Sequence, residues 1–215
     1  MENINKLIDH TLLKPEATSD QVLKLCEEAR QHDFASVMVN SSYVPLCKEA
    51  LLDTDVKIAT VIGFPLGACS THTKLEEVKQ ALRDGANEFD MVLNIGKLKD
   101  GKLEEVTHEI SAIKELVPNY VLKVIIETSL LSEQDKINAC QCVTEGKADY
   151  IKTSTGFSTG GATVEDVALL RKHVGKEVEV KASGGVRTYD DLVKMVEAGA
   201  SRIGTSNGVA LMKGL

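Results

Sequence analysis

Three observations predict that this chain folds as a (β/α)8 barrel, the closed parallel sheet surrounded by helices known as the TIM barrel. Strand-like and helix-like segments alternate from one end to the other, as in a parallel sheet covered by helices. Glycine recurs just past a helix end and shortly before a strand, at Gly85, Gly146 and Gly199. The tally reaches eight strands, and 215 residues suit a small barrel. We expect one α/β domain over residues 1–215, with an open doubly wound sheet as the alternative.

The strands are expected where short apolar, β-branched runs precede polar residues, and the helices where apolar residues recur at helical spacing. The first helix illustrates the rule, because Thr18 and Ser19 are candidate caps and Val22 and Leu25 fall on one face. The expected strands cover 7–13, 35–40, 56–62, 88–94, 121–127, 148–152, 178–183 and 202–205. The expected helices cover 19–31, 43–52, 73–84, 102–116, 132–145, 164–173 and 189–198.

Composition narrows the class of protein. A net charge of −7 argues against a nucleic-acid or anionic membrane surface. No apolar run reaches membrane-spanning length and residues 1–16 carry no signal-peptide pattern, so we expect a cytoplasmic protein. The five cysteines are odd in number and form no C-x-x-C, and the histidines lack metal-ligand spacing. We therefore expect no disulfide framework, metal or cofactor, and the absence of G-x-G-x-x-G weakens a dinucleotide site.

The strands have an apolar face and a polar face. In the run 88–94, Phe89 and Met91 share one face while Asp90 lies on the other, and Lys123 and Lys152 occupy polar faces of later strands. In a barrel the apolar faces meet the helices and the polar faces point inward. Because barrel interiors are normally filled by branched aliphatic residues, an inward polar set has to be paired or functional.

Lys152 ends a buried strand, which is an expensive place for an ammonium group. Taken alone, it could reach solvent or pair with an acid. However, Lys181 lies on the next strand, and Asp90 points the same way from an earlier one. A second cation keeps an amine neutral, and a carboxylate can hold that cation and relay protons. The three residues together predict a Schiff-base site at the carboxyl-terminal rim of the barrel.

Glycine-rich turns follow the last two strands, at 184–187 and 204–208. Each alone is only a flexible turn. In this order in a barrel, they favour a phosphate site, because backbone N–H groups can approach an anion there.

Five motifs spread over nearly the whole chain, LIDHTLLKPEAT, FDMVLNIG, YIKTSTGF, KASGGVRT and RIGTSNG, strongly resemble the deoxyribose-phosphate aldolase family. The resemblance implies a metal-free class I aldolase in which Lys152 forms the Schiff base, Lys181 perturbs it and Asp90 takes part in proton transfer. It further implies that Asp9 supports Lys181. The residues implied to bind the substrate phosphate are Gly184, Gly185, Gly204 and Ser206.

The chain departs from the family pattern at a few positions. Asn207 stands where a second serine is common, and Met38 and Ser41 stand where cysteine and proline are frequent. The sequence ends at Leu215 without the longer tail of some members, so a tail's role in proton transfer is not expected. None of these changes removes a residue of the expected site.

The resulting hypothesis is reversible cleavage of 2-deoxy-D-ribose 5-phosphate to acetaldehyde and D-glyceraldehyde 3-phosphate, a step of deoxyribose phosphate catabolism. The alternatives are another phosphosugar barrel enzyme, an isomerase or epimerase with electrostatic lysines, and a non-catalytic phosphate-metabolite binder. Two lysines at one rim argue against both. Barrels of this kind often dimerise, so a homodimer is considered, although no stretch specifies it.

Overall fold

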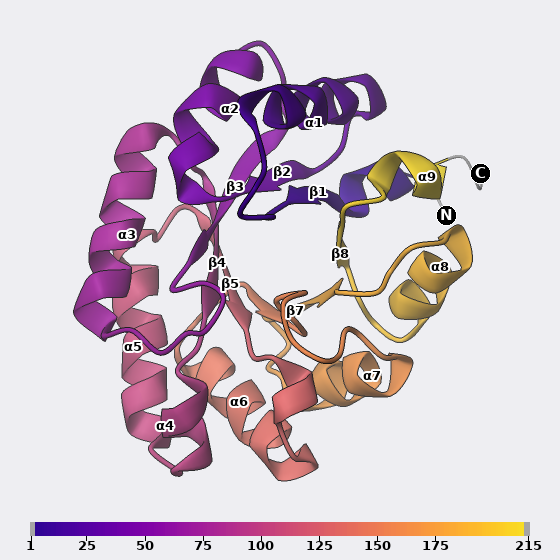
Figure 1. The fold of residues 1–215 in the computed structure, drawn as a ribbon. Helices are drawn as coiled ribbons and strands as arrows, with labels where there is room; N and C mark the ends of the chain where they lie inside the picture. Colours follow the sequence, from indigo (N-terminus) through magenta and orange to yellow (C-terminus); the bar gives the residue numbers. More distant parts are fainter. Residues whose placement is uncertain (1–2, 213–215) are drawn as a thin grey trace.

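The computed structural model describes residues 3–212, and these form a closed barrel of parallel strands ringed by helices (Figure 1). Each strand pairs with the next, and pairing of β1 with β8 through Ile8 and Ile203 closes the sheet. The predicted barrel is confirmed, and the open-sheet alternative is wrong. Residues 1–2 and 213–215 of the expected domain lie outside the described residues. The strands are β1 Ile8–Leu12, β2 Ser36–Val39, β3 Lys57–Ile62, β4 Glu88–Val92, β5 Val121–Ile125, β6 Tyr150–Lys152, β7 Glu179–Ser183 and β8 Arg202–Thr205.

All seven predicted helices are present, with ends shifted by a few residues at most. They are α1 Ser19–His32, α2 Val44–Ala50, α3 Thr71–Asp84, α5 Leu103–Leu116, α6 Glu133–Glu145, α7 Val164–His173 and α8 Tyr189–Glu197. The sequence prediction missed α4 Ile95–Lys99 and α9 Gly208–Met212, whose five residues are too few to show a helical period. The expected strand 88–94 therefore ends early, because the Asn94 side chain caps α4 by accepting from the Lys97 N–H.

The helix-to-strand junctions need a left-handed residue, and two of the three use the predicted glycine. Gly85 and Gly199 have φ of 110° and 113°. At the third junction Lys147 takes the left-handed conformation, with φ of 59°, and Gly146 has an ordinary φ of −73°. Glycine is required at 146 by packing, since a Cβ there would lie 2.6 Å from Cγ2 of Ile110.

The apolar strand faces pack against the helices, as the alternation predicts. Phe89, Met91 and Val124 have no exposed surface and belong to the main core between sheet and helices. The barrel interior has a second, smaller apolar cluster that lies on the side of β2 and β3. Its members are Leu13, Met38, Ala59 and Val61, with Phe64 packed against them. The remaining part of the interior holds buried charged and polar side chains, and these build the site.

Candidate active site

Lys152 is the last residue of β6 and is only 3% exposed. Its Nζ donates to Oδ2 of Asp90 at 2.8 Å, and its side chain lines a cavity of about 460 Å³ at the carboxyl ends of the strands. Burial lowers the pKa of Lys152, Asp90 raises it, and the charge of Lys181 lowers it again, leaving a pKa of about 8 against an ordinary 10.5. The amine is therefore far easier to deprotonate than an exposed lysine.

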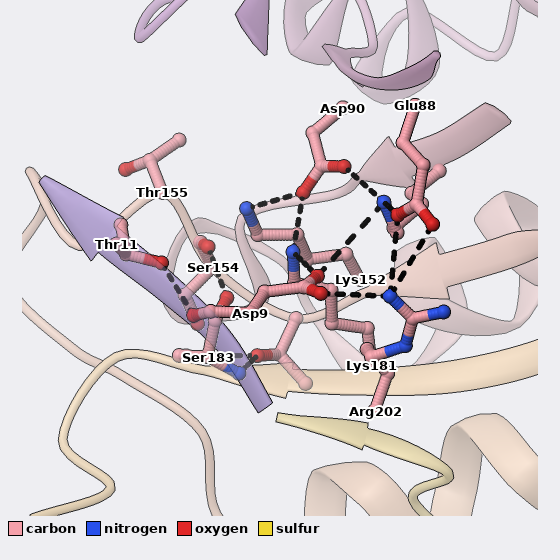
Figure 2. A network of polar contacts seen from close by, with 12 residues as sticks. Asp9, Thr11, Glu88, Asp90, Lys152, Ser154, Thr155, Lys181, Ser183 and Arg202 are labelled. Carbon is pink, nitrogen blue, oxygen red and sulfur yellow. Dashed lines mark hydrogen bonds and ion pairs between the residues drawn. The ribbon is translucent and has the colours of Figure 1, made fainter. Parts of the chain in front are cut away.

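Asp90 lies on β4 and links three lysines (Figure 2). Oδ2 accepts from Lys152 and, at 2.7 Å, from Lys181, while Oδ1 accepts from Lys123 at 2.9 Å. Burial raises the pKa of Asp90, but the three ammonium groups outweigh it and hold this pKa well below its usual range. The carboxylate is thus ionised and shared by the two lysines of the predicted site.

Lys181 and Lys152 are register partners on β7 and β6, so their side chains start side by side. The expected proximity of the two lysines is confirmed. Lys181 also lies 2.5 Å from Oδ2 of Asp9, in a fully buried ion pair. Asp9 is fully buried, and its Oδ1 accepts from the Ser36 hydroxyl at 2.7 Å. The predicted contact between Asp9 and Lys181 is therefore present.

Three charged residues of the cluster were not singled out from the sequence. Lys123 on β5 donates to Glu88 at 2.6 Å and to Asp90 at 2.9 Å. Arg202 opens β8 and reaches Asp9 at 2.7 Å and Glu88 at 3.2 Å. Strand alternation placed Lys123 on an inward face, and Glu88 has the same parity as Asp90 on β4. The contact of Arg202 with Asp9 needed barrel closure, because 193 positions separate the two residues.

The charges of the cluster explain why Lys152 is the amine that loses its proton readily. Within residues 3–212 it contains three carboxyl groups, of Asp9, Glu88 and Asp90, and four cationic groups, so one cation is in excess. Lys123, Lys181 and Arg202 each contact two or more carboxylates, and Lys152 contacts one. The positive charge of Lys152 is consequently balanced by the fewest carboxylates, and among the four cations Lys152 is the one that lines the cavity.

The four residues expected to bind phosphate all line the cavity, together with Arg187 and Lys14. Gly184 and Gly185 have φ of 83° and 85°, a backbone conformation that other residues rarely adopt. Gly204 is needed for space, since a Cβ there would lie 3.1 Å from Cε of Lys181. Ser206 and Asn207 are exposed on the turn after β8. One end of the cavity therefore offers glycine-rich backbone and cations to an anion.

The fold and the site together have the form of a barrel enzyme, because a buried amine with a lowered pKa lines a cavity at the carboxyl ends of the strands. A family model described as DeoC/LacD family aldolase matches residues 4–213, and the chain belongs to this family. Deoxyribose-phosphate aldolase from Brevibacillus brevis is 58% identical over 212 residues, which span 99% of this chain and 96% of that one.

Solved structures agree with this membership. Deoxyribose phosphate aldolase from Aeropyrum pernix, described as a tetramer, has a TM-score of 0.91 and 34% identity, covering 97% of this chain and 89% of that one. The aldolase QR15 has a TM-score of 0.94 and 38% identity, with 99% and 96% covered. The family membership makes the chain an aldolase, a lyase that breaks and forms carbon–carbon bonds. None of the helices in residues 3–212 has the length and apolarity to span a membrane.

Proposed function

We propose that the protein cleaves 2-deoxy-D-ribose 5-phosphate reversibly to acetaldehyde and D-glyceraldehyde 3-phosphate through a Schiff base on Lys152. The observation that carries the proposal is the Lys152 amine, with a pKa of about 8, in a cavity that the glycine-rich turns expected to bind a phosphate also line. The names of the relatives support this substrate. The isomerase alternative gives no reason for an amine with a lowered pKa that faces the cavity.

In the first half of the reaction, the lone pair of Lys152 attacks the C1 aldehyde. Loss of water then gives an iminium ion, which bears the positive charge that the neutral amine lacked. Asp90 and the cations around it are already fixed, so this charge forms next to a preorganised carboxylate at little reorganisation cost.

In the second half, the C3 hydroxyl loses its proton and the C2–C3 bond breaks. The electron pair of that bond moves to the iminium and forms an enamine, while glyceraldehyde 3-phosphate leaves. Asp90 and Lys181 do not line the cavity, so a water molecule carries the proton between them and the substrate. Protonation of the enamine at C2 and hydrolysis of the resulting imine release acetaldehyde and regenerate Lys152.

The remaining residues orient the substrate and the acid–base pair. Asp9 acts through Lys181, with which it forms a buried ion pair. Gly184, Gly185, Gly204 and Ser206 bind the phosphate through backbone N–H groups and one hydroxyl, with Arg187 in reach of the same end. Binding the phosphate at one end places C1 at Lys152, which supplies orientation.

Two finer points belong to the same proposal. A cytoplasmic location fits the acidic composition. A homodimer fits the habit of such barrels, although the Aeropyrum pernix relative is described as a tetramer. Sedimentation velocity of the purified protein distinguishes monomer, dimer and tetramer.

The decisive experiment is reduction with borohydride in the presence of deoxyribose 5-phosphate, followed by mass spectrometry of peptides. We expect inactivation and one adduct at Lys152. An adduct at a different lysine, or turnover that survives trapping, would refute the mechanism. A parallel assay of acetaldehyde release tests the substrate, and the variant Lys152→Met serves as the control that forms no adduct.

A further inference from the structure

Glu127 is a buried acid that the mechanism above does not use. It lies two residues past the end of β5, is 3% exposed and does not line the cavity. Its backbone is left-handed, with φ of 55° and ψ of 68°, which is unusual for a residue with a side chain. Such a conformation persists only where the surroundings determine it, and it often accompanies a functional role.

Both oxygens of the Glu127 carboxyl group face Thr155. The Thr155 N–H lies 3.4 Å from Oε1 and 3.3 Å from Oε2, and the Thr155 hydroxyl donates to Oε2. On either side of Glu127, the N–H of Ile126 donates to the Lys152 carbonyl and that of Thr128 to the Thr153 carbonyl. Residues 126–128 are therefore joined to residues 152–155 by a series of hydrogen bonds.

The contact continues from Thr155 to the mouth of the cavity. Thr155 Oγ1 accepts from the Phe157 N–H at 3.0 Å, so Glu127, Thr155 and Phe157 form one chain of hydrogen bonds. The Phe157 ring is about half exposed and meets Phe64 edge to face, with ring centroids 5.3 Å apart. Residues 155–157 line the cavity, and Gly156 between them has φ of 83°. A Cβ added at Gly156 would meet no other atom of residues 3–212 within 4 Å.

Gly156 itself is not held by packing, and Glu127 is the buried side chain that binds Thr155 next to it. We propose that Glu127 is a positioning residue, which fixes residues 155–157 against the part of the substrate that lies beyond the carbon bonded to Lys152. The inference rests on the proposed function. It predicts that Glu127 affects binding of the sugar phosphate. Imine formation with acetaldehyde should be unchanged, because acetaldehyde lacks the three further carbons and the phosphate of the sugar.

The test compares two readouts in each variant: KM for deoxyribose 5-phosphate, and the rate of reductive trapping of acetaldehyde on Lys152. In Glu127→Ala the N–H and hydroxyl of Thr155 lose their acceptor, and we expect KM to rise about tenfold while trapping changes by less than about twofold. Glu127→Gln keeps a carbonyl acceptor and should restore KM. Glu127→Gly removes the carboxyl group while relieving the left-handed backbone, so it reproduces the KM effect without the strain.

Thr155→Val supplies the second arm of a double-mutant cycle. If the two residues act as one unit, the double variant with Glu127→Ala raises KM no further than either single change. An unchanged KM in the Ala and Gly variants overturns the inference, as does a parallel fall in trapping, which would indicate a merely structural role. If the unmodified protein does not turn over deoxyribose 5-phosphate, the proposed function fails and this inference fails with it.

Discussion

The charge on Lys181 is expected to set the pH at which Lys152 becomes a nucleophile. Both amines donate to the same oxygen of Asp90, at 2.7 and 2.8 Å. Two unit charges roughly 5 Å apart repel by about 3 kcal/mol at an effective dielectric constant of about 20. Lys181→Met removes this repulsion and also leaves Asp90 to a closer pairing with Lys152. Both effects raise the pKa of Lys152 above its present value of about 8.

The size of the change follows from the titration. A pKa of about 8 leaves roughly a tenth of the amine deprotonated at pH 7, and each further unit reduces that fraction about tenfold. We expect Lys181→Met to raise the pKa by at least about one unit, so trapping of acetaldehyde at pH 7 falls about tenfold or more and recovers toward pH 9. The assay is the pH dependence of reductive trapping on Lys152, followed by the mass of the ethyl adduct.

Arg202→Met is the matched control, because it removes another cation of the cluster that contacts neither Lys152 nor Asp90. It should destabilise the protein and leave the trapping profile in place. Asp9 and Asp90 each keep other cationic partners in the Lys181 variant, so neither becomes an orphaned buried charge. A profile for Lys181→Met that coincides with that of the unmodified protein would show that the charge of Lys181 does not set the pKa of Lys152.

Three further substitutions test the shared carboxylate of the site, a buried ion pair outside it and the turn expected to bind the phosphate. Asp90→Asn removes the anion that raises the pKa of Lys152, so the trapping profile should move to lower pH while turnover of the sugar phosphate falls about 100-fold or more; a shift to higher pH contradicts the assignment. Lys74→Met leaves Glu109, its buried partner at 2.6 Å, without its cation and should lower the free energy of unfolding by about 3–5 kcal/mol in urea titrations, whereas a loss below about 1 kcal/mol speaks against a tight pair. Gly185→Ala forces a side chain to φ of 85° and should cost about 1–2 kcal/mol of stability and raise KM for the sugar phosphate; equal KM values would show that this turn does not bind the phosphate.

Strand alternation gave the correct side for the charged residues of three strands that build the site. It placed Asp90, Lys123 and Lys152 inward, and all three lie in the buried cluster. The period of two is a local property of the backbone, so it needs no tertiary information. The junction at Gly146 shows the limit of such local reasoning, because a packing contact with Ile110 explains the glycine and a neighbouring lysine makes the turn.

The pairing of charged residues in the site could not be predicted from strand alternation. Arg202 and Glu88 meet because β8 closes onto β1 and the side chains then cross the barrel. Glu127 lies past the end of β5, and its contact with Thr155 depends on how two turns fold over each other. The two short helices α4 and α9 were missed for the related reason that they depend on capping and tertiary packing more than on periodicity.

The sequence by itself determined the order of the strands and the longer helices, the faces that each strand presents and the presence of two lysines and an aspartate on inward faces of the strands. Each of these is set by spacing along the chain. Only the tertiary structure decided which amine has the lowered pKa, because that depends on burial and on how many carboxylates surround each cation, and the carboxylates come from strands that are distant in sequence. Lys152 has one such partner and the other three cations have more. The selectivity among the amines is therefore a property of the closed barrel.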